Sequence, residues 1–405
     1  MDINSTEAAR QNADATVQFR VIPINGAADS SLSRLPATVP HRLGRLRVLH
    51  EVARGGMGVV LRVYDETLDR ELAVKVLDPD IDPDSEAGQQ FGREPLVAGR
   101  LHHPNIIPVY ESGMLPDGRP YFVMPFLRGD TFSSRLARRE DRGHELSRWL
   151  RVFERMCAAV AHAHEQGVVH RDLKPSNVML GRHGEVLVMD WGVAKILGTP
   201  DSCWQPPPAM KEGHWVLGTP AYMSPEQARG ESAGADVRCD VFGLGAVLCE
   251  ILTGEPPYVG PDAEAIRRQS VAGDLSDAGR RLCRCGADPD LIDLAFRCMA
   301  SNPDDRPADA GAVLRAVSEY LAALESRAHA AELGRVASET VVREEGKRRR
   351  LARVMAIAVV VCAFVAALTN WGVLVARAGV WGLSPNPEPV ITPSGDKQTE
   401  PAPSP

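Results

Sequence analysis

The chain has 405 residues, 44% of them hydrophobic, and a formal net charge of −7. This globular composition excludes a fibrous or wholly disordered protein, and the mild acidity gives no electrostatic reason to expect nucleic acid as a main partner. The eight cysteines are scattered, and Cys283-Arg284-Cys285 lacks the second cysteine pair of a zinc site, so reduced thiols are the simpler interpretation.

The N-terminal four fifths of the sequence divide into a tail and one large folded unit. Residues 1–42 are polar and without periodicity, which predicts a disordered tail, and they contain no signal peptide. Residues 43–324 begin with strand-like runs, at Val59–Leu61 and Leu72–Val74, and continue with longer amphipathic stretches such as Trp149–His164. This order predicts an α+β fold with a small strand-rich lobe and a larger helical lobe.

The C-terminal part has the pattern of a membrane anchor. Residues 325–353 predict a basic helical linker. The 23 residues 354–376, in which Thr369 and Asn370 interrupt an apolar run, are long enough to cross a bilayer as a helix. A buried core helix is the alternative, but only the proline-rich tail 377–405 follows. The basic run before the span predicts a single-pass protein of the cell membrane, with the large unit cytoplasmic and the tail outside. We favour anchoring, or homodimerisation through residues 325–376, over sensing by so short a tail.

Four motifs follow one another along residues 43–324. They are Ala53-Arg54-Gly55-Gly56-Met57-Gly58, Leu72-Ala73-Val74-Lys75, His170-Arg171-Asp172-Leu173-Lys174-Pro175-Ser176-Asn177 and Asp190-Trp191-Gly192. Each motif alone has an ordinary explanation, such as a turn, a solvated lysine or a capping aspartate. In this order and spacing they resemble the protein kinase family, most closely the eukaryotic-type (Hanks-type) Ser/Thr kinases of bacteria. The resemblance implies a bilobal protein kinase fold that transfers the γ-phosphoryl group of ATP to Ser or Thr hydroxyls of proteins, with autophosphorylation.

The first two motifs, together with a hinge segment, form the predicted ATP site. The glycines allow backbone amides to approach phosphates, and Lys75 supplies a positive charge that Glu94 would hold in place. Residues 123–127 fit the strand and hinge beside the adenine, although a plain buried strand has the same pattern. The predicted ATP-binding residues are Ala53, Arg54, Gly55, Gly56, Met57, Gly58, Val60, Ala73, Lys75, Met124, Pro125 and Leu127.

The last two motifs contain the residues predicted to act in phosphoryl transfer. The predicted catalytic residues are Asp172 and Lys174, together with Lys75 and Glu94. Asp172 would orient the acceptor hydroxyl and take its proton, and Lys174 would neutralise charge on the transferred group. Asn177 and Asp190 offer the hard oxygen ligands that Mg²⁺ prefers, with Mn²⁺ as an alternative ion.

Further downstream, the resemblance assigns supporting roles. Thr219 would lie near Asp172 and favour Ser/Thr substrates, Glu226 and Arg306 would form a buried ion pair, and Asp240 would support the catalytic loop. In the activation segment, Thr199 and Ser202 are the candidate phosphorylation sites.

Three residues depart from the family pattern. Ala53 replaces a loop glycine, Trp191 replaces the usual Phe, and Pro95 follows Glu94 directly. Because proline disfavours helical geometry at the preceding residue, we expect a short or kinked, mobile helix and a Lys75–Glu94 pair that is not always formed. These departures leave a second hypothesis, a membrane-tethered pseudokinase that binds nucleotide as a scaffold.

Overall fold

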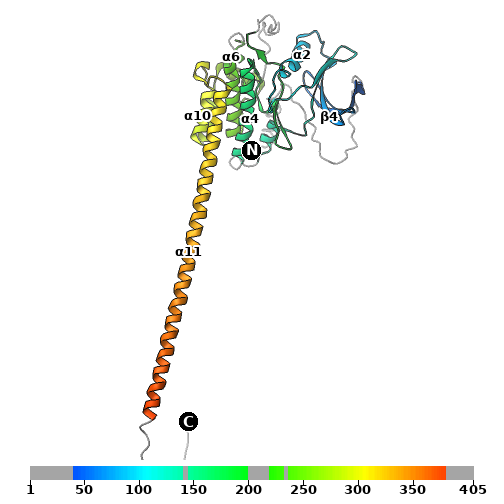
Figure 1. Cartoon of the computed structure of the whole chain (residues 1–405). Helices are drawn as coiled ribbons and strands as arrows, with labels where there is room; N and C mark the ends of the chain where they lie inside the picture. Colours follow the sequence, from blue (N-terminus) through cyan, green and yellow to red (C-terminus); the bar gives the residue numbers. More distant parts are fainter. Residues whose placement is uncertain (1–39, 140–144, 199–218, 232–235, 380–405) are drawn as a thin grey trace, which may run out of the picture. The chain divides into compact units, whose positions relative to one another are not determined.

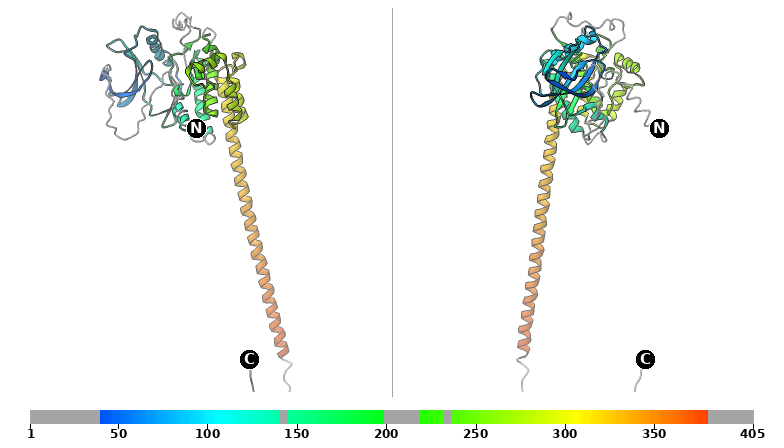
Figure 2. Two further views of the ribbon diagram at one scale, coloured as in Figure 1. Left: turned by 180° about the vertical axis from the view of Figure 1, so that it is seen from behind. Right: turned by 90° about the vertical axis from the view of Figure 1, so that its right-hand side faces the viewer.

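The computed structural model describes residues 40–139, 145–198, 219–231 and 236–379. The chain divides into two compact units, Met1–Glu325 and Ser326–Pro405. The first unit has two lobes, one built on a sheet and the other on helices, which are seen side by side in Figure 1 and in the left view of Figure 2. The predicted bilobal α+β fold is therefore confirmed.

The smaller lobe is a six-stranded antiparallel sheet in the order β1-β2-β3-β4-β6-β5. Its inward side chains, among them Leu61, Val63 and Val74, are completely buried, as expected where β-branched and aliphatic residues alternate along strands. The strands are β1 (Arg42–Leu43), β2 (Leu46–Arg54), β3 (Gly58–Asp65), β4 (Arg70–Leu77), β5 (Glu111–Met114) and β6 (Pro120–Pro125).

One helix, α2 (Glu86–Ala98), accompanies this sheet. It begins at Ser85, whose side-chain oxygen accepts a hydrogen bond from the amide of Gly88 at 3.2 Å. The expectation was a short or kinked helix, and the short alternative is wrong, because α2 has 13 residues and continues past Pro95. Pro95 lies in the last turn, where a missing amide removes one hydrogen bond without stopping the helix.

The larger lobe is helical and carries two small sheets near its junction with the first lobe. The sheets join β7 (Gly129–Thr131) to β9 (Val178–Gly181) and β10 (Val186–Val188), and β8 (Val168–Val169) to β11 (Lys195–Ile196). The helices are α3 (Phe132–Ala137), α4 (Leu146–Glu165), α6 (Pro225–Ala228), α7 (Val237–Thr253), α8 (Ala263–Ala272), α9 (Ser276–Arg284), α10 (Pro289–Cys298) and the start of α11 (Ala310–Gly379), with 3₁₀ turns η1 (Pro175–Asn177), η3 (Pro220–Tyr222) and η4 (Pro303–Asp305).

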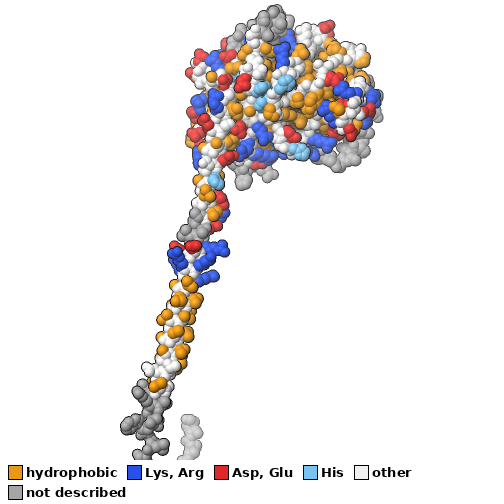
Figure 3. Space-filling model, viewed as in Figure 1, with side chains coloured by type: hydrophobic (Ala, Val, Ile, Leu, Met, Phe, Trp, Pro, Cys, Tyr) orange, Lys and Arg blue, Asp and Glu red, His pale blue; other side chains and the backbone are white. Residues whose placement is uncertain are grey.

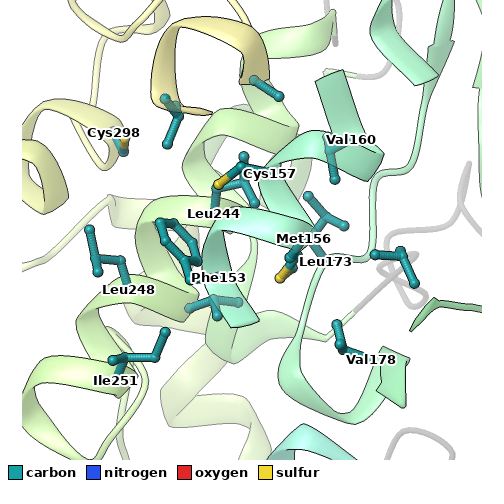
Figure 4. Close-up of a cluster of buried hydrophobic side chains, with 14 of the residues drawn as sticks. Phe153, Met156, Cys157, Val160, Leu173, Val178, Leu244, Leu248, Ile251 and Cys298 are labelled. Carbon is teal, nitrogen blue, oxygen red and sulfur yellow. The ribbon is translucent and has the colours of Figure 1, made fainter. Parts of the chain in front are cut away.

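The helical core extends to the loop that carries Asp172. Phe153 and Met156 of α4 pack in one buried cluster with Leu244 and Leu248 of α7 (Figure 4). Leu173, which stands between Asp172 and Lys174, belongs to the same cluster and is 3% exposed. Burying a leucine side chain contributes about 2 kcal/mol, so the core itself holds this loop in place.

The second unit contains one apolar helical segment within α11. The stretch Arg343–Val373 is long and apolar enough to cross a membrane, and none of its most apolar window is buried in the described structure. Figure 3 shows the order along the helix, with Lys and Arg side chains preceding the hydrophobic ones. The helix continues to Gly379, three residues beyond the predicted span, and β1 begins at Arg42, the last residue of the predicted tail.

Candidate active site

A cavity of about 470 Å³ lies between the two lobes. Its lining includes Ala98 of α2 and Ile107, and residues from the sheet, from the segment after β6 and from β9. The predicted residues that line it are Ala53, Val60, Ala73, Lys75, Glu94, Met124, Pro125, Leu127 and Asp190. The structure therefore brings the predicted adenine contacts together with Lys75, Glu94 and Asp190 at one cavity.

The glycine-rich segment forms the turn from β2 to β3. The amide of Gly55 donates to the carbonyl of Gly58 at 2.8 Å and closes the turn. A side chain at Gly58 would meet the Val76 carbonyl oxygen at 2.4 Å, so only glycine fits there. Arg54, Gly55, Gly56, Met57 and Gly58 are not among the lining residues, and the Arg54 guanidinium pairs with Glu51 and Asp78 instead.

Three charged side chains meet at the inner part of the cavity. The Lys75 ammonium donates to Glu94 Oε2 at 2.5 Å and lies 3.9 Å from Asp190 Oδ1. Burial lowers the pKa of Lys75, but the two carboxylates outweigh it and the net shift is upward. Burial raises the pKa of Glu94, and the Asp190 carboxylate adds to that shift while Lys75 opposes it. We infer that Lys75 and Glu94 form a charged pair, because their short contact stabilises the ammonium.

Asp172 lies in a second cluster of hydrogen bonds. Its Oδ1 accepts from the backbone amide of Thr219 at 2.9 Å, and its Oδ2 lies 3.0 Å from the Lys174 ammonium. The Asn177 side-chain amide donates to Asp172 Oδ2 at 3.1 Å, and Lys174 donates to Thr219 Oγ1 at 2.5 Å. Burial raises the pKa of Asp172, yet Lys174 and the hydrogen bonds hold the net pKa below its usual range. The carboxylate is therefore ionised at neutral pH.

The loop around Asp172 is held by hydrogen bonds to the carboxylate of Asp240. The backbone amides of His170 and Arg171 each donate to this carboxylate at 2.7 Å, and His164 Nε2 lies 3.0 Å from it. Arg171 has a φ of 68° and Asp190 a φ of 64°, in the left-handed region that costs non-glycine residues about 1 kcal/mol or more. The surrounding hydrogen bonds impose a conformation that the isolated chain would avoid.

Asn177 and Asp190 fit a divalent cation. The amide nitrogen of Asn177 is committed to Asp172, which leaves its amide oxygen as the acceptor for a cation. The amide of Met189, next to Asp190, donates to the Asn177 carbonyl at 2.9 Å, so the two segments are joined. Within the described ranges no three His, Cys, Asp or Glu side chains converge on a metal site. A cation here would need further oxygen ligands from the substrate phosphates.

Glu226 and Arg306 form the predicted ion pair in the helical lobe. Two nearly parallel bonds of 2.6 and 2.9 Å join them. Burial raises the pKa of Glu226, but the Arg306 guanidinium outweighs it and holds the net pKa below its usual range. Thr199 and Ser202 lie outside the described residues.

Several residues of the cavity wall were not predicted. Arg62 lies two residues after Val60 on β3, so strand alternation would have placed it on the same face. Trp191 is buried against the His170 ring, with centroids 4.6 Å apart, which explains how the larger ring is accommodated. Phe126 belongs to the predicted hinge segment, and the other lining residues missed are Val52, Ala98, Ile107, Val109, Phe122, Arg128, Gly129, Asp130, Thr131, Arg135, Arg138, Met179, Arg182 and Met189.

Comparison with known proteins agrees with this geometry. The family model described as protein kinase domain matches residues 46–317, and the chain belongs to that family. It is 37% identical over 273 residues to the serine/threonine-protein kinase PknB of Mycolicibacterium smegmatis, which covers 66% of this chain and 42% of PknB. It is 35% identical over 272 residues to the serine/threonine-protein kinase pkn3 of Myxococcus xanthus, covering 66% of this chain and 48% of pkn3. The chain thus spans less than half the length of these relatives.

A protein kinase domain implies ATP and a divalent metal ion as ligands. The names of the relatives describe serine/threonine kinases and give no support to a non-catalytic scaffold.

Proposed function

We propose that this chain is a Ser/Thr protein kinase that transfers the γ-phosphoryl group of ATP to protein hydroxyls. The observation that carries the proposal is the cluster around Asp172. An ionised carboxylate, held by the Thr219 amide and paired with Lys174, lies in the loop that also presents Asn177. An aspartate with a purely structural role would not need a lysine and a threonine amide arranged around its carboxylate.

In the proposed mechanism Asp172 orients the acceptor hydroxyl and takes its proton as the new oxygen–phosphorus bond forms and the bond to ADP breaks. Lys174 offsets negative charge on the transferred group, and Thr219 fixes Lys174 through its hydroxyl. Lys75 would bind the α- and β-phosphates, and Glu94 holds its ammonium at the cavity wall. These residues act by positioning and charge neutralisation, without a covalent intermediate.

Asn177 and Asp190 would hold Mg²⁺, or Mn²⁺ in its place. A bound divalent ion supplies positive charge that neutralises phosphate oxygens during transfer. The supporting feature is the pair of hard oxygen donors on two segments joined by the Met189–Asn177 hydrogen bond.

We also propose that the helix within Arg343–Val373 anchors the kinase in the cell membrane. The run Lys347–Arg350 precedes the apolar stretch, and the positive-inside rule then places residues 43–324 in the cytoplasm and the tail outside. Replacing residues 354–376 with an unrelated apolar helix would leave activity and membrane attachment unchanged if the span only anchors. Loss of activity would point to homodimerisation or sensing.

The activity test is phosphoryl transfer by the full chain. With ATP labelled in the γ-phosphate and Mg²⁺, we expect label on serine or threonine of an acceptor protein, and about 10³-fold less with Asp172→Asn. Measured ATP binding by both proteins with transfer by neither would establish the scaffold instead.

A further inference from the structure

The exposed edge of the interlobe cavity carries a group of arginines, which we call the basic rim: Arg128, Arg135, Arg138 and Arg182. All four line the cavity. The side chains of the first three are 58%, 37% and 63% exposed, and Arg182 is also exposed. This is a local concentration of positive charge in a chain whose net charge is −7.

Among the described residues, the carboxylates that pair with the basic rim do not neutralise it. Asp130 is shared between Arg135, at 2.9 Å, and Arg138, at 3.4 Å. Glu71 pairs with Arg128 at 2.9 Å and also with Arg62 of the same cavity. Each guanidinium offers five N–H donors in a fork that matches a carboxylate, so donors remain for an additional acid.

The helix that carries Arg135 contacts the turn that follows Asp172. Arg135 is on α3 and Arg138 caps its C-terminal end. Helix α3 contacts the 3₁₀ turn η1, which follows Asp172 and Lys174 directly in the chain, and β7 contacts the same turn. The turn consists of Pro175, Ser176 and Asn177 and adds no acidic group.

We propose that the basic rim binds acidic side chains of the protein substrate, so that the kinase selects Ser or Thr residues flanked by Asp or Glu. This inference rests on the proposed function and names its substrate class. A peptide that presents its hydroxyl to Asp172 lies next to α3, where a flanking carboxylate meets the guanidinium groups of Arg135 and Arg138. Because these arginines are partly exposed, the attraction is screened by salt.

Peptide binding tests the inference without catalysis. The full chain in non-ionic detergent is titrated, without ATP, into a fluorescent serine-containing peptide flanked by glutamates. We expect the Arg135→Gln/Arg138→Gln variant to bind about tenfold more weakly than the wild type, since two charge-assisted contacts are lost. Arg135→Lys/Arg138→Lys should retain most of the affinity. The matched control, Arg348→Gln/Arg349→Gln in the run before the span, should bind as the wild type does.

Three results would overturn the inference. They are equal binding by the wild type and the Gln variant of the rim, equal binding of a peptide with Gln in place of Glu, and loss of binding only in the control. A rim variant that keeps the peptide but loses ATP affinity would also overturn it, because the arginines would then serve the nucleotide phosphates.

Activity measurements separate this inference from the proposed function. In the wild type, kcat/KM should favour the glutamate peptide over its glutamine counterpart about tenfold, and the rim variant should lose that ratio. Rim-dependent binding with no transfer to any peptide refutes the kinase proposal alone. Transfer with no charge preference refutes the substrate class alone.

Discussion

Two buried glutamates, Glu94 and Glu226, are each paired with a cation, and the two pairs differ in geometry. Glu226 and Arg306 are joined by two bonds, and Arg306 also donates to the carbonyl of Ala300 at 2.7 Å. The Lys75 ammonium donates to Glu94 Oε2 at 2.5 Å, and Glu94 lies on a helix that contains Pro95 in its last turn. The first pair is fixed by several groups, and the second depends on where one helix lies.

The surroundings shift the pKa values of the two glutamates in opposite directions. Burial opposes ionisation of both, but the guanidinium fork more than compensates for Glu226, whose pKa is lowered. The pKa of Glu94 is raised, because burial dominates and the Asp190 carboxylate repels a second negative charge. We infer that Glu226 serves the folded state and Glu94 serves the reaction at some cost in stability.

The largest expected effect concerns Glu226. Glu226→Gln leaves the Arg306 cation buried without its counter-charge, and should lower the free energy of unfolding by about 3–5 kcal/mol. Denaturant unfolding of the full chain in detergent measures it. Glu264→Gln, which breaks an exposed pair with Arg267, is the control and should cost about 0–1 kcal/mol. A similar loss of unfolding free energy in both variants would contradict the structural role of Glu226.

Glu94→Gln should lower the activity and leave the stability unchanged, in contrast to Glu226→Gln. We expect kcat/KM for phosphoryl transfer to fall about 10²-fold, because the Lys75 ammonium loses the partner that positions it. The unfolding free energy should stay close to that of the wild type, because Asp190 remains 3.9 Å from the ammonium as a counter-charge and burial of the Glu94 carboxylate is relieved. Steady-state kinetics and unfolding of the same preparation check both parts. Glu86→Gln, in the first turn of the same helix, is the control and should remain as active as the wild type. An active Glu94→Gln enzyme would contradict the assignment.

The pH dependence of stability should separate the two pairs by sign. Glu226 has a folded-state pKa below its usual 4.5, so its contribution is complete above that pH and is lost as the pH falls below it. Glu94 has a folded-state pKa above 4.5, so its protonation stabilises the protein as the pH falls through the range above 4.5. We therefore compare the unfolding free energy of the wild type with that of each Gln variant across pH 4 to 7. With rising pH, the advantage of the wild type over Glu226→Gln should grow, and its advantage over Glu94→Gln should shrink. Differences of the same sign would contradict the comparison.

The smallest effect is expected at Pro95. Pro95→Ala restores the missing amide donor in α2 and should raise basal kcat/KM about threefold by favouring the paired position of Glu94. Kinetics without prior phosphorylation of the enzyme provide the measurement. Unchanged basal activity would mean that Pro95 does not limit the pair.

Much of the fold could be predicted because its signals are local. Alternating aliphatic residues indicate the strands, the glycines between β2 and β3 indicate the turn, and residues 149–164 lie within α4. The length of α2 could not be predicted locally, because proline disfavours helical geometry at the preceding Glu94, whereas the helix continues on both sides of this pair.

The candidate site likewise contains residues that short motifs locate and residues that only the tertiary structure brings together. The motifs locate Lys75, Asp172 and Asp190, since each lies in a recognisable short segment. The basic rim could not be predicted, because Arg128 and Arg182 are far apart in the sequence. They are brought together by the pairing of β7 with β9, which the backbone hydrogen bond from Arg182 to Arg128 at 3.1 Å extends. Only the tertiary structure brings these arginines to one cavity.

Amide hydrogen exchange in the full chain tests the comparison most directly. Without nucleotide, the amides of α2 should exchange at least about tenfold faster than those of α7, and ATP with Mg²⁺ should slow α2 while leaving α7 unchanged. Exchange of α2 that is already as slow as that of α7, and that ATP does not alter, would contradict the claim that the Lys75–Glu94 pair is the variable element of this kinase.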